Sequence, residues 1–406
     1  TALAASCSPA SATPPPSPEA TPPLPSPVVT ILSTPTVFPS APPSEGTPPS
    51  SPAPASPLPS VAVPTLAPVG PRDYPPDVNP LTGLPVSDPA LLDRRPVAVK
   101  VANSPRIVRP QSGLSLADLV FEHIAEGGNT RLTAIYLGHD AEQVGPVRSA
   151  RLIDLELPAM YRAVFGFSGA SIGTRDKLIR VDFVTRAFSE IGAGPGPWFF
   201  RVDPDDLNVL MANTAELGKL SLERGNTGGR QDLKGLAFDP TPPNGGGPAA
   251  QINLRYSEET YNEWRFDPPT GHYTRWSDLK EGGVKQLIDA LTLQTISAAN
   301  VAVVFAPTFL TDILEDDEGF DPATGTGGHY GYQIQLWNTG PAIVFRDGLA
   351  YPVTWVRFNR ADELYFVVSG DQVLPFKPGN TWVELVGVRT TQTAVNGTWS
   401  FVHQAP

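Results

Sequence analysis

The sequence predicts an α+β protein, in which a disordered proline-rich tether precedes a mixed α/β first domain and a β-rich second domain. Proline, serine, alanine and threonine dominate residues 8–72. From residue 73, β-branched runs alternate with helical spacings, which is typical of a mixed α/β domain. After residue 249, short β-branched and aromatic runs follow one another closely, which favours strands. The chain of 406 residues is long enough for two folded units.

Composition excludes several classes of protein. The net charge of −12 lacks the basic footprint of a nucleic-acid binder, so we expect no nucleic-acid partner. Cys7 is the single cysteine and the five histidines are scattered, so we expect no disulfide, metal site or cofactor. No apolar run reaches the roughly 18–20 residues of a transmembrane helix.

Residues 1–7 resemble the end of a lipoprotein signal peptide. Ala5 and Ser6 are the small residues that precede a lipidation cysteine, so we expect lipid on Cys7. An incidental cysteine in an ordinary signal peptide is the alternative. Lipid on Cys7 would make the membrane a partner and hold the protein at the outer face of the cytoplasmic membrane.

Residues 8–72 are predicted to be a disordered tether. Proline lacks an amide donor and fixes φ, so neither helix nor sheet persists there. The segment cannot bury enough apolar surface to offset its ordering entropy. Polyproline II rises about 3.1 Å per residue, so the tether would carry the folded part into the cell wall.

The first domain is predicted over residues 73–228. Its expected strands are residues 95–103, 119–125, 132–137 and 163–168, and its expected helices lie within 149–162, 177–181 and 204–220. Glycine and proline from residue 225 to residue 248 mark a boundary.

The second domain is predicted over residues 249–390, with residues 391–406 as a tail. Residues 284–293 have its one convincing helical spacing. The expected strands are 251–256, 261–266, 272–276, 301–305, 330–337, 343–345, 351–358, 363–368 and 382–386.

Several motifs carry a resemblance to a known family. They include Asn79–Pro85, Arg109–Ser115, Ala117–Glu122, Ala125–Gly128, Val144–Arg151, Asn300–Val304 and Pro378–Trp382, of which Val144–Arg151 is the most specific. Over about residues 76–390 the chain resembles the YerB-like family of bacterial lipoproteins. That resemblance implies a two-part domain on a lipid-anchored protein, and it implies no particular activity.

The richest polar group lies in the first domain. Planar arginine donors and a helix start both suit a carboxylate or phosphate, so we predict a ligand site there. Its residues are Arg109, Gln111, Arg131, Arg148, Ser149 and Arg151, and we expect Arg148, Arg151 and Asp154 to share one helix face. The alternative is an internal salt-bridge network with Asp118, Glu122 and Glu126, which the near balance of charges favours.

Catalysis is the second hypothesis. Glu122 or Glu126 could act as a general base beside an arginine, although no G-x-S-x-G motif or other catalytic constellation is present. We interpret residues 312–321 as a solvated acidic loop and most of the tryptophans as core. The sequence therefore favours a non-catalytic binding or scaffolding protein of the cell envelope, with a cell-wall component or an envelope protein as partner. An enzyme acting on envelope polymers is the alternative.

Overall fold

The computed structural model describes residues 66–203 and 209–404. Cys7 and residues 8–65 of the expected tether lie outside the described residues. Residues 66–72, predicted as the end of the tether, belong to the folded part instead. Val69 and Phe238 each donate a backbone hydrogen bond to the other, at 2.9 and 2.8 Å, and this bridge ties residue 69 to the folded part.

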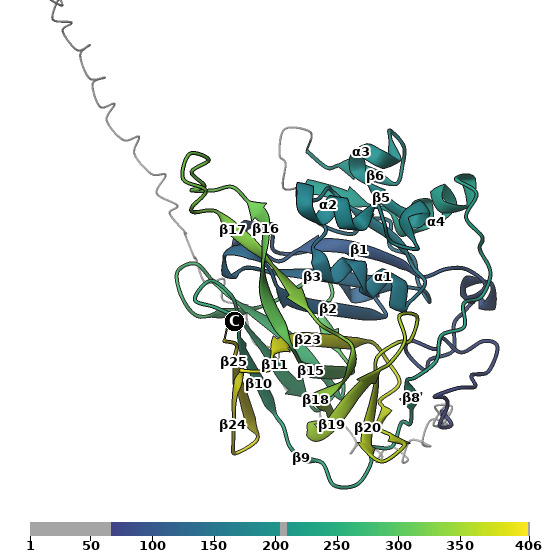
Figure 1. Cartoon of the computed structure of the whole chain (residues 1–406). Coiled ribbons are helices and arrows are strands. Elements are labelled where there is room, and N and C mark those ends of the chain that lie inside the picture. The colour runs from purple at the N-terminus through teal and green to yellow at the C-terminus, as the bar shows by residue number, and fades with distance from the viewer. Residues whose placement is uncertain (1–65, 204–208, 405–406) are drawn as a thin grey trace, which may run out of the picture. The chain divides into compact units, whose positions relative to one another are not determined.

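One twelve-stranded sheet runs through both predicted domains (Figure 1). From one edge its strands are β21 (Gln372–Val373), β20 (Tyr365–Ser369), β19 (Leu349–Arg357), β18 (Asn338–Arg346), β15 (Asn300–Ala306), β23 (Thr381–Gly387), β2 (Leu119–Ile124), β3 (Thr130–Tyr136), β1 (Val97–Ala102), β4 (Val164–Phe167) and β5 (Ala187–Ser189). The short β9 (Gly247–Pro248) pairs with β19.

The central strands explain why the sheet is continuous. β2 pairs in parallel with β23, from Leu119 opposite Thr381 to His123 opposite Leu385. Every residue of β1, β2, β3, β15 and β23 is buried, as expected for strands covered on both faces. A single hydrophobic core therefore includes residues from both predicted domains.

A second sheet of seven strands packs beside the first. Its strands are β13 (Val284–Gln286), β12 (His272–Asp278), β11 (Tyr261–Asp267), β10 (Gln251–Arg255), β25 (Thr398–Val402) and β24 (Thr391–Val395), with β14 (Ser297–Ala298) on β12. Trp264 of β11 meets Trp382 of β23 edge-on, with ring centroids 5.1 Å apart. Alternate residues of β12 are buried, so Tyr273, Arg275 and Ser277 face inward.

The remaining elements are short. A two-stranded ribbon joins β16 (Thr308–Asp316) and β17 (His329–Ile334), and the other pairs are β6 (Phe199–Arg201) with β7 (Leu210–Ala212) and β8 (Ala237–Phe238) with β22 (Pro375–Phe376). The α-helices are α1 (Leu157–Met160), α2 (Ile172–Leu178), α3 (Glu190–Ala193) and α4 (Thr214–Glu223). The 3-10 helices are η1 (Pro89–Leu92), η2 (Arg106–Val108), η3 (Leu114–Leu116), η4 (Glu126–Gly128), η5 (Leu152–Leu155) and η6 (Val184–Arg186). Strands thus dominate, and a mixed α/β first domain is not confirmed.

Several predicted elements are wrong. The helix expected at 284–293 is strand β13 followed by a turn, in which Leu293 has a positive φ of 58°. The tail expected from residue 391 forms β24 and β25, and β25 pairs in parallel with β10. Residues 312–316 of the expected acidic loop lie in β16. The helix expected over 149–162 is reduced to η5 and α1, and within 204–220 the described part is β7 and then α4.

Candidate functional site

The predicted ligand residues do not form one site. Arg131 and Arg151 meet Glu126 on the first half of the large sheet, whereas Arg109 and Gln111 lie against Asn103 and the second sheet. Ser149 and Arg148 are half-buried beside the first group. The two groups therefore lie at separate places in the fold.

Arg151 is held by the backbone and by Glu126. It caps η5 in an extended conformation, with φ −127° and ψ 170°, so the predicted helix face with Arg148 and Asp154 does not form. Nε donates to Glu126 Oε2 at 2.5 Å, and Nη2 donates to Glu126 Oε1. Nη1 donates to the carbonyl of Ala150 at 3.0 Å. This paired geometry occupies the guanidinium with internal acceptors.

The ribbon and β3 complete this cluster. Arg131 Nη2 donates to Glu126 Oε1 at 3.2 Å, and Glu315 of β16 places Oε2 3.6 Å from Arg151 Nε. Burial alone would raise the pKa of Glu126, but its bonds to Arg151 outweigh burial and lower the pKa to about 2. A carboxylate in this state is a poor general base at neutral pH.

A buried lysine lies beneath this cluster. Lys100 of β1 places Nζ 2.8 Å from Asp154 Oδ2 and 2.6 Å from His123 Nε2, and the side chains of Lys100 and Asp154 are fully buried. Burial lowers the pKa of Lys100 to about 8 although Asp154 opposes the shift. Sequence reasoning missed this lysine, which stands inside an apolar strand run.

Glu122, the other candidate base, is completely buried. Its Oε1 accepts hydrogen bonds from Asn103, Thr130 and Asn262 at 2.8–3.0 Å. Arg275 Nη2 donates to its Oε2 at 2.5 Å. The Glu122 side chain is 0% exposed, so it cannot reach a substrate.

Arg275 also reaches Glu384, which lies on β23 beside β2. Nη1 donates to Glu384 Oε1 at 3.1 Å, and the guanidinium lies 4.4 Å from the Trp382 ring centroid. Trp264 and Tyr256 donate to Glu384 as well. Burial and the charge of Glu122 raise the pKa of Glu384 to about 8. Sequence reasoning missed Arg275 and Glu384, because residues that meet across two sheets are far apart in the sequence and form no recognisable local motif.

Arg109 borders a small pocket, and Gln111 lies nearby against Asn103. Arg109 Nη1 donates to Asp278 Oδ1 at 2.9 Å, and Nε donates to the carbonyl of Asn103 at 3.0 Å. Gln111 Nε2 donates to Asn103 Oδ1 at 3.0 Å. Arg109 and the β12–β13 turn line a pocket of about 290 Å³.

The chain is similar to known proteins over most of its length. The model described as "Protein of unknown function (DUF3048) N-terminal domain" matches residues 81–225, and the corresponding C-terminal domain matches residues 252–383. The chain belongs to the DUF3048 family. It is 31% identical over 317 residues to "Putative lipoprotein YerB" of Bacillus subtilis (strain 168), covering 76% of this chain and 85% of that protein. The crystal structure of Bacillus subtilis YerB matches with a TM-score of 0.62 and 27% identity, over 76% of this chain and 96% of that one.

These matches confirm the resemblance seen in the sequence. Glu122 lies in the N-terminal DUF3048 region and Arg275 in the C-terminal one. The ion triad therefore joins both DUF3048 regions across the β2–β23 pair. This position favours a structural role for the triad in this DUF3048 chain.

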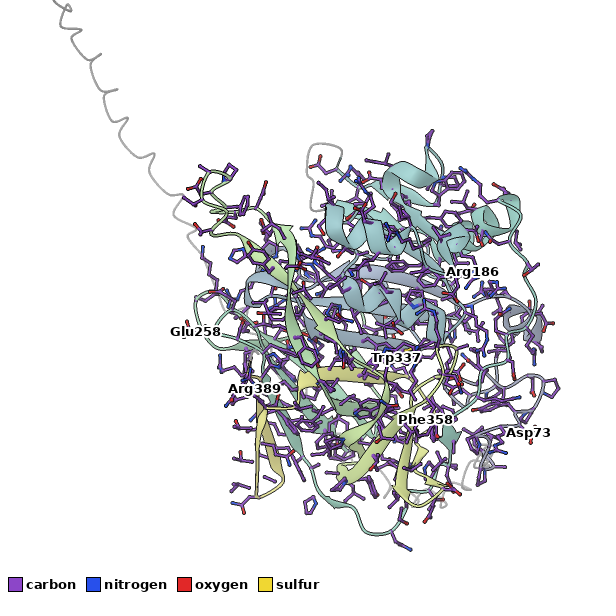
Figure 2. The ribbon with its side chains drawn as sticks, in the orientation of Figure 1. Asp73, Arg186, Glu258, Trp337, Phe358 and Arg389 are labelled. Atoms are coloured by element: carbon purple, nitrogen blue, oxygen red, sulfur yellow. The ribbon has the colours of Figure 1, made fainter. Side chains whose placement is uncertain are left out.

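In this DUF3048 chain, a groove of about 990 Å³ lies at the β18–β21 end of the large sheet. Cross-strand partners share a face, so residues from neighbouring strands form one floor. The floor residues are Thr339, Thr354, Val356, Tyr365, Val367 and Val373. Phe358, labelled in Figure 2, follows β19 at the groove and is 59% exposed. Another wall is formed by Pro71, Arg72, Asp232, Lys234 and Gly235.

Most of the second-domain tryptophans were predicted to lie in the core. Trp264, Trp355 and Trp382 are buried, whereas Trp337 is 36% exposed. Over residues 66–203 and 209–404, no group of His, Cys, Asp and Glu could hold a metal ion. None of the helices in these described ranges is long and apolar enough to cross a membrane.

Proposed function

We propose that this chain is a non-catalytic binding protein of the bacterial cell envelope, held at the outer face of the cytoplasmic membrane by lipid on Cys7. The small residues before Cys7 and the lipoprotein name of the related YerB support the anchor. The proline-rich segment that follows would let the folded part reach into the cell wall.

The state of the two candidate bases carries the non-catalytic part of the proposal. A general base must lie within hydrogen-bond reach of its substrate. Glu122 is fully buried and bonded to four side chains, and Glu126 is paired with Arg151 and Arg131. Carboxylates paired in this way support a structural role over catalysis.

The groove on the sheet is the proposed binding surface. Its floor combines threonine and valine residues, and Tyr365 and Phe358 add aromatic area. Such a surface can contact an extended polymer along several strands, with aromatic residues as anchors. A cell-wall component is therefore the partner that the groove suits best.

The test is retention of isolated cell-wall material by the immobilised full chain. Thr354→Lys places a long charged side chain on the groove floor, and Thr393→Lys is the matched control on the exposed strand β24. We expect the groove variant to lose about tenfold in retention while the control keeps wild-type retention. Equal retention by both variants at unchanged melting temperature would overturn the groove as the binding surface.

A further inference from the structure

The pocket between the two DUF3048 regions has a charge that differs from the rest of the chain. Four cationic side chains line it, Arg106, Arg109, Lys280 and Lys285, against two acidic ones, Asp278 and Glu281. Glu259 pairs with Arg106 at 3.2 Å beside the pocket, so the local excess is one positive charge (four minus three), in a chain of net charge −12. An excess of positive charge concentrates anions locally.

The pairing of these charges leaves some of them available. Asp278 accepts from both arginines, with Arg106 Nε at 2.7 Å and Arg109 Nη1 at 2.9 Å. Arg106 Nη1 also donates to Glu259 Oε2 at 3.2 Å, whereas Asp278 is the carboxylate that pairs with Arg109. Lys280 and Lys285 are exposed, and neither forms an ion pair within the described part of the chain.

Arg109 provides the second, independent observation. Its side chain is only 7% exposed, and Nε and Nη1 are already used by Asn103 and Asp278. Its remaining nitrogen, Nη2, is buried and donates no hydrogen bond to any described residue. A buried donor without an acceptor is unfavourable, so an occupant that Nη2 reaches after a small movement of the Arg109 side chain would be stabilised.

The rest of the lining is apolar. Pro110, Leu279, Leu287 and Ile288 line the same pocket, and Leu287 is 6% exposed. The volume of about 290 Å³ lies at the lower end of the range for small-molecule sites. The pocket therefore suits a small occupant with both a charged end and an apolar end.

We propose that this pocket binds a small amphipathic anion, whose carboxylate or phosphate is held by Arg109, Lys280 and Lys285 and whose apolar end contacts Leu279 and Leu287. The inference goes beyond the proposed function, because the groove on β18–β21 is a different surface formed by other residues. Arginine presents paired donors to either anion, so both anions share this chemistry.

The test is isothermal titration of the full chain carrying Cys7→Ser, which removes competing lipid and detergent. Hexanoate and hexyl phosphate are the probes, inorganic phosphate lacks the apolar end, and hexanol lacks the charge. We expect one of the two amphipathic anions to bind with Kd below about 1 mM, and hexanol and inorganic phosphate to bind at least tenfold more weakly. The stronger of the two arms identifies the anion as a carboxylate or a phosphate.

Variants of the two exposed lysines test the proposal without Arg109→Gln, which changes a buried side chain that is bonded to Asn103 and Asp278. Lys280→Gln/Lys285→Gln changes exposed side chains only, and we expect it to weaken binding about tenfold and to reduce its dependence on salt. Lys177→Gln, on the exposed surface of α2, should bind as the parent does. Binding of neither anion, binding of hexanol as strong as that of the anions, or unchanged binding by the double variant would each overturn the proposal.

Discussion

Arg275 on β12 donates to Glu122 on β2 at 2.5 Å, and each of the two side chains is at most 1% exposed. The residues are 153 positions apart in the sequence. Their contact fixes the second sheet against the large one, and Glu384 extends it to β23. A buried ion group of this kind contributes to stability mainly through the cost of breaking it.

Arg275→Met should strongly destabilise the protein, by about 3–5 kcal/mol, because it leaves the Glu122 carboxylate buried without its cation. Urea unfolding followed by tryptophan fluorescence measures the change. Arg265→Met is the matched control on the neighbouring strand β11, where the side chain is 39% exposed. It should cost less than about 1 kcal/mol. A loss for Arg275→Met no larger than for the control would contradict a structural triad.

The sequence predicted most strands but not their partners. Strands such as 301–305 and 382–386 were predictable because β-branched and aromatic residues dominate them. That β23 pairs with β2, across some 260 residues of chain, has no local signal. The inward position of Arg275 was hidden for the same reason, since alternation alone places an arginine on the solvent face.

The wrong helix at 284–293 shows how tertiary contacts override local spacing. Val284, Leu287 and Leu291 recur at helical intervals. In the structure Asp289 instead accepts from the amides of Gly113 and Ser115, at 2.9 and 2.7 Å. These bonds and those within the turn favour a compact turn over a helix. The helix face predicted to carry Arg148 and Arg151 is also absent from the described residues, because Arg151 is extended and turns back to Glu126.

Separating the two DUF3048 regions should abolish folding. Residues 66–248 alone would expose the edge of β2, whose residues are all buried in the whole protein. We expect residues 66–248 and 249–406, expressed separately, to be insoluble or to lack a cooperative melt. Co-expression should restore a soluble complex. A sharp thermal transition for either piece alone would contradict this prediction.

Arg151 and Arg148 should behave differently when changed. Arg151→Gln removes the paired bonds to Glu126, so we expect a loss of about 2–4 kcal/mol in the free energy of unfolding. Arg148 is half-buried, and Arg148→Gln should cost less than about 1 kcal/mol. Chemical denaturation measures both. If Arg148 belongs to the predicted ligand site, Arg148→Gln should lower retention of envelope material without changing the melting temperature.

Glu363 at the groove should make stability depend on pH. It is 5% exposed and accepts from Arg162 Nη1 at 3.0 Å and from the amide of Lys234 at 2.9 Å. Burial outweighs these bonds and raises the pKa of Glu363 from 4.5 to about 7. Between those values the folded state binds more protons than the unfolded state. The contribution of Glu363 to stability is therefore complete below pH 4.5 and is lost as the pH rises through 7.

Glu363→Gln removes this titration. Relative to the variant, the wild-type protein should lose about 2 kcal/mol in the free energy of unfolding between pH 5 and pH 7. Urea unfolding at the two pH values measures the difference, and Glu258→Gln, an exposed glutamate labelled in Figure 2, is the control. Parallel pH profiles for wild type and Glu363→Gln would mean that the Glu363 carboxyl ionises alike in the folded and unfolded states. The groove would then hold its charge at neutral pH without cost to the fold.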